Sequence, residues 1–293
     1  MNYDVIQVDA FASKPLDGNP CAVLPDARGL DDALMQRIAR EMNLSETAFV
    51  FPGERTDFRV RYFTPYWEIP MAGHPTVATV HTLSELGIIG ADRAGVTLEM
   101  PAGIVPVRIE REHPRPRYVM RQLAPNFLRK YPRELFAQAL DLGEDDFLDD
   151  HPLPQTVSTG TPQLMIALRD AAALARARPD VRKLFGDVDG KDYFSVHVFA
   201  RQEKDDVKLI SRHFADFGGS LVEDPFTGSA SGGMAAYCAH YGLIEERSYR
   251  IAQGDHVGRP GRGYIRVLGE GDAIEAVEVG GEAVTVLRGT LTL

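Results

Sequence analysis

A six-residue pattern, Glu-x-Pro-x-x-Gly, occurs at residues 68–73 and again at residues 223–228, 155 positions later. The same offset relates Gly103 to Gly258, so the match extends over about 35 residues without a gap, which indicates two copies of one structural unit. The chain is therefore expected to fold as two similar halves.

The length supports the same division. A chain of 293 residues corresponds to roughly two domains of about 150 residues each. The Pro-rich segment 113–117 is the best candidate for a linker. We therefore predict a first domain over residues 1–116 and a second over residues 117–283, with a strand at about 284–293 able to return to the first.

The order of predicted elements indicates the fold class. Strands outnumber helices and follow one another as in hairpins, which favours an α+β protein over a doubly wound parallel sheet. In each half, a helix follows the repeated pattern, at residues 75–86 and 230–241.

The composition disfavours several classes of binding partner. The net charge of −10 disfavours nucleic acid and anionic membranes as partners, and no apolar run approaches the ~20 residues that a membrane span needs. The two cysteines, Cys21 and Cys238, are too few for a disulfide framework, and the first residues read as a strand rather than a secretory signal. We expect a cytoplasmic protein, no metal, and a small molecule as ligand.

The two predicted helix starts are candidate anion sites. Gly73 and His74 precede the first helix, and Gly228 and Ser229 precede the second, with serine a favoured N-cap residue. Free backbone N–H groups and the helix dipole at such positions favour a carboxylate or an enolate. Ordinary capping is the alternative interpretation.

Three side chains are candidates for the chemistry. His74 has a side chain whose ordinary pKa suits acid-base work, although a half-buried turn residue is the alternative. Asp224 stands where the first copy has Ile69, so the duplication does not explain the carboxylate, although an Asp-Pro turn former is the alternative. Glu46 enters an apolar strand, where burial raises a carboxyl pKa into a range that suits proton transfer, although it could be a turn residue.

Two other glutamates occur in both copies. Glu68 and Glu223 occupy equivalent places in the repeat, which favours a shared structural pairing, such as a bond to backbone N–H groups.

These residues resemble the PhzF phenazine-biosynthesis-like proteins, which share the diaminopimelate epimerase-like fold. The stretches that carry the likeness span nearly the whole chain and are Val8–Phe11 with Gly18-Asn19-Pro20, Glu41–Glu46, Phe63–Pro75, Val222–Ala230, Gln253-Gly254 and Gly258-Arg259-Pro260.

The resemblance implies two similar domains, each with a mixed or antiparallel sheet wrapped around a central helix, and an active site in the cleft between them. It implies that Glu46, His74 and Asp224 are catalytic, while Gly73, Gly228 and Ser229 line the site. It also implies a homodimer and a reaction without metal or organic cofactor, similar to the isomerisation of trans-2,3-dihydro-3-hydroxyanthranilate. There the glutamate takes a proton from C3 and returns one at C1.

Two alternatives remain open at this stage. Related racemases and epimerases of this fold use two cysteines at the two helix starts, where this chain has His74 and Ser229. A two-thiol mechanism is therefore disfavoured. A racemase or epimerase and a ligand-binding protein without turnover are the two alternative hypotheses. The residues around Trp67 and Phe226 flank the motifs and leave the shape of the substrate open.

Overall fold

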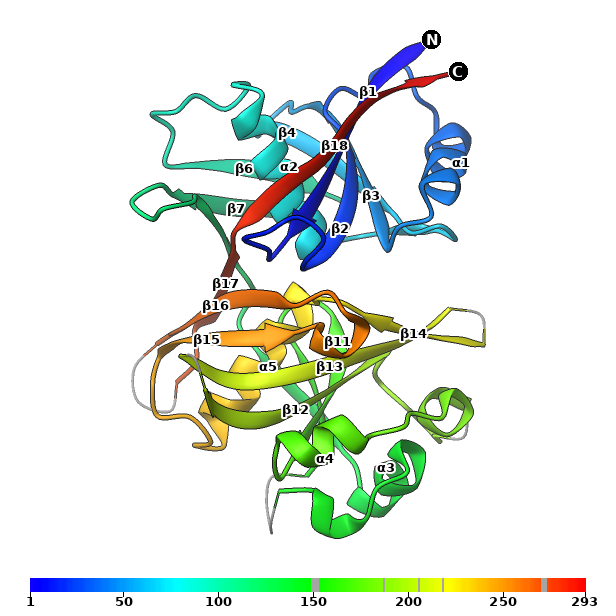
Figure 1. Ribbon diagram of the computed structural model, residues 1–293, viewed down its shortest axis with the longest axis vertical. Coiled ribbons are helices and arrows are strands. Elements are labelled where there is room, and N and C mark those ends of the chain that lie inside the picture. The colour runs from blue at the N-terminus through cyan, green and yellow to red at the C-terminus, as the bar shows by residue number, and fades with distance from the viewer. Residues whose placement is uncertain (149–152, 187, 205, 218, 270–272) are drawn as a thin grey trace. The chain divides into compact units, whose positions relative to one another are not determined.

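The computed structural model describes residues 1–148, 153–186, 188–204, 206–217, 219–269 and 273–293 (Figure 1). The chain divides into two compact units. The first unit comprises Met1–Arg121 together with Gly280–Leu293, and the second comprises Gln122–Val279.

The first unit is a mixed sheet with two helices. Its elements are β1 (Asn2–Ala10), β2 (Asn19–Leu24), α1 (Asp32–Met42), β3 (Glu46–Pro52), β4 (Phe58–Phe63), β5 (Glu68–Ile69), α2 (His74–Glu85), β6 (Gly95–Met100), β7 (Gly103–Glu110), β8 (Arg117–Arg121) and β18 (Ala283–Thr292). The strand pairing runs β18, β1, β2, β3, β4, and β4 then pairs with both β5 and β6, which is followed by β7 and β8. The β2–β3 and β4–β6 pairs are parallel, and the others are antiparallel.

The second unit has the same plan. Its elements are β9 (Asn126–Lys130), α3 (Arg133–Leu140), η1 (Glu144–Asp146), β10 (Gln155–Ser158), β11 (Pro162–Leu168), α4 (Ala171–Arg176), η2 (Arg182–Gly186), β12 (Ser195–Lys204), β13 (Val207–Phe217), β14 (Ser220–Asp224), α5 (Gly228–His240), β15 (Ser248–Gln253), η3 (Asp255–Val257) and β16 (Gly261–Leu268), and β17 (Ala276–Gly281) leads back to the first unit. The pairing runs β9, β10, β11, β12, β13, and β13 pairs with both β14 and β15, which is followed by β16. The β11–β12 and β13–β15 pairs are parallel.

The two units therefore repeat one topology. The strands β1 to β7 correspond in order to β10 to β16, and the two parallel pairs fall at the same places in each unit. Chain duplication, which the sequence offset predicts, explains this agreement.

Each unit contains one central helix, α2 in the first and α5 in the second (Figure 1). Nine of the twelve residues of α2 and ten of the thirteen of α5 are buried, so neither helix has a broad solvent face. Helix α2 packs against β1, β2 and β3, and helix α5 packs against β10, β11 and β12. The predicted helices at 75–86 and 230–241 are confirmed, each beginning one or two residues earlier than expected.

Small residues let α5 lie close to its sheet. A Cβ atom added at Gly233 would lie 2.7 Å from Cε of Met165 in β11, which is closer than carbon atoms can pack. A Cβ at Gly232 would overlap the side-chain amide of Gln122. Glycine at these two positions leaves room for the side chains of Gln122 and Met165 against the start of α5.

The repeated glutamates have equivalent partners in the two units. Arg61 donates from Nε and Nη2 to the two carboxylate oxygens of Glu68, at 2.7 and 2.6 Å. Arg212 donates in the same bidentate manner to Glu223, at 2.9 and 2.8 Å. The shared structural pairing is thus present, but its donor is a guanidinium group rather than the backbone N–H groups that we expected. Bidentate pairs of this kind are strong and directional.

The Pro-rich segment 113–117 is not a linker. It connects β7 to β8, which pair antiparallel with Ile109 opposite Tyr118 and Glu110 opposite Arg117. The segment therefore belongs to a hairpin inside the first unit, because proline is tolerated in turns as well as between domains.

Within the described residues, the helices are all too short or too polar to cross a membrane.

Candidate active site

The first unit brings Glu46 and His74 together. Glu46 is the first residue of β3, and His74 is the first residue of α2, with Gly73 as the N-cap. The Nε2 atom of His74 lies 3.1 Å from Oε2 of Glu46, and the two side chains are 5% and 17% exposed. Because the contact is shielded from water, the electrostatic coupling between the two groups is strong.

The His74 ring is neutral at physiological pH. Burial lowers the pKa of His74 to about 3, and the backbone carbonyl of Pro20 opposes this only in part. A neutral imidazole has one N–H donor and one acceptor nitrogen, so it can contact Glu46 in either of that residue's protonation states.

Asn19 holds the other side of the ring. Its Nδ2 lies 3.0 Å from Nδ1 of His74, and both side chains are buried. When Asn19 donates to Nδ1, the His74 proton lies on Nε2 and points to the Glu46 carboxylate. When the proton is instead on Nδ1, the Asn19 amide must turn to present its oxygen as the acceptor, and Nε2 can then accept from a protonated Glu46. The surroundings of Nδ1 therefore accommodate either neutral tautomer of His74.

The second unit places Asp224 in a polar cluster. Asp224 is the last residue of β14, and the hydroxyl of Thr227 donates to its Oδ2. Gln253 Nε2 donates to the Asp224 carbonyl at 2.7 Å, while Gln253 Oε1 accepts from the Thr227 amide at 3.2 Å. Gln253 thus fixes the turn that carries the Asp224 carboxylate.

Gly228 and Ser229 are the first two residues of α5. The predicted N-cap role of Ser229 is wrong, because Thr227 is the N-cap and Ser229 lies in the first turn. Its hydroxyl accepts from Gln163 Nε2 at 3.1 Å, and the carbonyl of Gly228 accepts from Gln122 Nε2 at 2.8 Å.

The structure assigns polar partners that sequence reasoning missed. Asn19 and Gln253 belong to motifs noted in the sequence, but their contacts depend on residues 55 and 29 positions away. Gln163 lies inside an apolar strand and gives no local signal. Only the pairing of the strands shows which side chains these amides reach.

Neither cysteine occupies the start of α2 or α5. Cys21 is opposite Glu46 in the β2–β3 pair, and both burial and the negative charge of Glu46 raise the pKa of its thiol well above the ordinary value. Cys238 is buried within α5, and burial raises its pKa as well. Both thiols are therefore protonated at neutral pH and poorly suited to abstract a proton from carbon.

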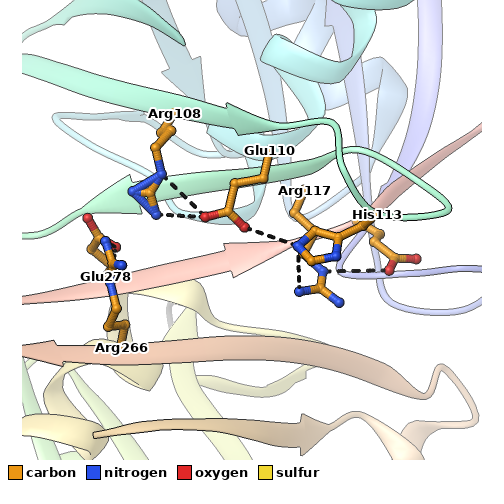
Figure 2. Close-up of polar contacts among 7 residues, drawn as sticks. Arg108, Glu110, His113, Arg117, Arg266 and Glu278 are labelled. Atoms are coloured by element: carbon orange, nitrogen blue, oxygen red, sulfur yellow. Dashed lines mark hydrogen bonds and ion pairs between the residues drawn. The ribbon is translucent and has the colours of Figure 1, made fainter. Parts of the chain in front are cut away.

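A separate group of acidic and histidine side chains lies on the β7–β8 hairpin. Glu110, Glu112 and His113 approach one another closely enough to surround a cation. Figure 2 shows that arginines already occupy this group, since Arg108 Nη2 lies 2.8 Å from Glu110 and Arg117 Nη1 lies 3.0 Å from His113 Nε2. Guanidinium groups at these positions would repel a metal ion, so the geometry is that of an ion-pair network.

Comparisons with known proteins agree with this architecture. The family model PhzC-PhzF, described as phenazine biosynthesis-like protein, matches residues 8–289. The trans-2,3-dihydro-3-hydroxyanthranilate isomerase of Pseudomonas aeruginosa is 37% identical over 288 residues, which cover 97% of this chain and 97% of that enzyme.

Solved structures show the same fold. The crystal structure of the Bacillus anthracis phenazine biosynthesis protein of the PhzF family has a TM-score of 0.88 and 30% identity, with 100% of both chains covered. A hydroxyproline epimerase from Agrobacterium vitis has a TM-score of 0.61 at 12% identity, covering 99% of this chain and 91% of that one, and at this identity the likeness concerns the fold alone. The predicted fold class, α+β with two similar domains each built around a central helix, is confirmed.

Proposed function

The chain belongs to the PhzC-PhzF family of phenazine biosynthesis-like proteins and is an isomerase, and we propose that it moves a proton between two carbons of a small carboxylate-bearing substrate without a cofactor. The observation that carries this proposal is the 3.1 Å contact between the mostly buried Glu46 carboxylate and the neutral His74 ring.

Glu46 is the proposed general base and, after it has taken a proton, the general acid. A single carboxyl group that removes a proton from one carbon and returns it to another needs no net proton from solvent. His74 is poised for this cycle because its neutral ring can donate to the carboxylate or accept from the acid. Both side chains are mostly buried, which strengthens the electrostatic coupling between them.

Asp224 and His74 are proposed to hold and polarise the polar substituents of the substrate. The backbone N–H groups at Gly73 and at Gly228–Ser229, which begin α2 and α5, are proposed to bind its anionic group. Helix N-termini suit this task because their free N–H groups and dipole favour negative charge. The enolate-like charge that develops after proton removal is stabilised by the same groups.

The substrate class follows from the relatives. Because the Pseudomonas aeruginosa relative is named for trans-2,3-dihydro-3-hydroxyanthranilate, this compound or an analogue that shares its carboxylate and its removable carbon-bound proton is the proposed substrate. We further propose that the protein works as a homodimer in the cytoplasm.

A two-thiol racemase is the competing function, and the protonated, buried state of Cys21 and Cys238 disfavours it.

The test is an assay of the purified protein with trans-2,3-dihydro-3-hydroxyanthranilate and, in parallel, with each enantiomer of a panel of amino acids. The proposal predicts that the amount of trans-2,3-dihydro-3-hydroxyanthranilate falls when the enzyme is added. Interconversion of amino-acid enantiomers with no isomerisation of the hydroxyanthranilate would overturn it.

A further inference from the structure

Three residues on neighbouring strands of the second unit form a polar row. His197 of β12 is directly opposite His213 of β13, and His213 is directly opposite Asp224 of β14. Residues that are directly opposite in antiparallel strands project from the same face of the sheet, with Cβ atoms about 5 Å apart. We call His197, His213 and Asp224 the His–His–Asp row.

The first unit has no such row at the equivalent place. The corresponding strands β3, β4 and β5 place Ala48 opposite Tyr62 and Tyr62 opposite Ile69. All three positions therefore differ between the copies, and they differ together: a carboxylate at one strand is accompanied by a histidine on each of the next two. The three polar side chains are therefore particular to the second copy, where they lie next to one another across three strands.

The two histidines are costly to bury. His197 is fully buried and His213 is 3% exposed, and burial keeps both rings neutral, with the pKa of His213 at about 3 and that of His197 well below its ordinary value. Their Nδ1 atoms lie 3.2 Å apart, so one ring donates and the other accepts. A buried polar pair in the place of an alanine and a tyrosine needs a compensating role.

The burial of one nitrogen decides the direction of that hydrogen bond. Nε2 of His197 is enclosed and has no hydrogen-bond partner among the described residues. A buried N–H without an acceptor is rarer than a buried acceptor without a donor. His197 therefore carries its proton on Nδ1 and donates to Nδ1 of His213, which leaves the proton of His213 on Nε2.

Further polar side chains lie along the same strands. Ser211, two residues before His213 and on the same face of β13, contacts Gln253 Oε1 at 3.4 Å, and Gln253 in turn holds Asp224 and Thr227. The first two turns of α5, residues 228–233, contain no ionisable side chain. Asp224 is therefore the carboxyl-bearing residue directly opposite His213 on this face of β13 and β14 in the described part of the chain.

We propose that His213 is a positioning residue for Asp224, with a neutral ring whose Nε2–H is directed by His197 toward the Asp224 end of the row. This inference rests on the proposed role of Asp224 in substrate binding. A neutral donor beside the carboxylate restricts its orientation without cancelling its charge, so that Asp224 can still engage a polar substrate group. His197 contributes indirectly, because it determines which nitrogen of His213 carries the proton.

The first test reads the tautomers directly and needs no substrate. Protein labelled with ¹⁵N-histidine is studied by two-bond ¹H–¹⁵N correlation spectra between pH 5.5 and 8, with resonances assigned from the spectra of histidine variants. We expect His213 as the neutral Nε2–H form and His197 as the neutral Nδ1–H form throughout this range. A His213 ring that carries its proton on Nδ1, or that becomes charged in this range, would overturn the proposal while leaving the proposed function untouched.

The second test measures the effect on Asp224. The ¹³Cγ resonance of Asp224 is followed in His213→Leu, which removes the donor, and in His213→Gln, whose side-chain amide can replace Nε2–H. His240→Leu is the matched control, since His240 is an exposed histidine at the other end of α5 that stacks on Phe127. We expect a shift in His213→Leu, recovery toward the wild-type position in His213→Gln, and no change in the control.

Steady-state kinetics complete the test. We expect His213→Leu to raise KM at least tenfold with a smaller effect on kcat, and His213→Gln to recover most of that change. An unchanged Asp224 resonance in a folded His213→Leu protein would overturn the positioning role. If the wild-type protein does not turn over the hydroxyanthranilate probe, the proposed function fails, and the two spectroscopic tests still decide the present inference.

Discussion

His74 Nε2 lies 3.1 Å from Oε2 of Glu46, and the two residues begin different elements of the first unit, helix α2 and strand β3. The contact thus joins the first residue of a helix, His74, to the first residue of a strand, Glu46. Both side chains are mostly buried, and burial keeps the ring uncharged, which suits the acid-base role that we propose for the pair.

We predict that His74→Gln lowers kcat on the hydroxyanthranilate probe by 10²- to 10⁴-fold, the usual size of an acid-base contribution. Glutamine keeps a hydrogen-bonding end but cannot alternate between donor and acceptor at one atom as imidazole tautomers do. His81→Gln is the control, because His81 lies later in the same helix and contacts Tyr118 and Thr285 instead. A His74→Gln protein with kcat within threefold of wild type would show that the ring is dispensable.

We predict that Asn19→Asp makes the His74 ring charged at neutral pH. A carboxylate in place of the amide, 3.0 Å from Nδ1, would stabilise the imidazolium and raise the pKa of His74. Asn19→Leu, in contrast, should leave the ring neutral while it loses the hydrogen bond. Histidine ¹⁵N shifts of both variants, recorded between pH 5 and 8, check this. A neutral His74 at pH 6 in Asn19→Asp would contradict the assigned geometry.

The buried histidines predict how stability depends on pH. Burial lowers the pKa of His74 and of His213 to about 3 and lowers that of His197 as well, whereas each is 6.5 in the absence of such effects. The unfolded chain therefore binds protons first as the pH falls. The stability due to the neutral rings is fully present above about pH 6.5 and is lost toward about pH 3, with a slope of roughly 1.4 kcal/mol per pH unit for each histidine.

Urea unfolding at pH 7.5, 6.5, 5.5 and 4.5 measures this slope. His256→Ala should leave it unchanged, since His256 is exposed. His213→Leu should reduce it, because one buried ring no longer resists protonation. Equal stability at pH 7.5 and pH 5.5 would contradict the assignment of neutral buried rings.

The Arg212–Glu223 pair predicts a structural effect that is separate from catalysis. Arg212 also donates from Nη1 to the carbonyls of Leu174 and Ala177, so Arg212→Met removes several bonds and leaves the Glu223 carboxylate largely buried without its cation. We expect a loss of about 3 kcal/mol in the free energy of unfolding. The double variant, with Arg212→Met and Glu223→Gln, should recover part of this loss in the free energy of unfolding. Differential scanning calorimetry of the single and the double variant checks this. Equal losses in the free energy of unfolding in both variants would contradict the prediction.

Much of this fold could be predicted from the sequence because the duplication is visible as a constant offset. The central helices and the pairing of Glu68 with a structural partner follow from it, since equivalent places in two copies serve equivalent tasks. The Pro-rich segment 113–117 could not be identified as a hairpin turn, because proline marks turns and linkers alike.

The candidate site was predictable only in part. Glu46, His74 and Asp224 could be selected, but the contact between Glu46 and His74 depends on how β2 and β3 pair and on where α2 crosses them. The cross-strand neighbours of Asp224 are determined by register, and a shift of one residue would place His213 on the opposite face of the sheet. Spacing along the chain does not contain that information.

The exchange of carbon-bound hydrogen with deuterated water in Glu46→Gln is the most direct test of the proposed general base. Glutamine preserves the size and the contact to His74 but cannot accept a proton from carbon. Wild-type protein and the variant are incubated with trans-2,3-dihydro-3-hydroxyanthranilate in deuterated water, and binding of a hydroxyanthranilate-like acid is measured by calorimetry. We predict that Glu46→Gln loses deuterium incorporation and turnover while it binds the acid with an affinity within about fivefold of wild type, less than 1 kcal/mol. Deuterium incorporation by Glu46→Gln at the wild-type rate would contradict the assignment.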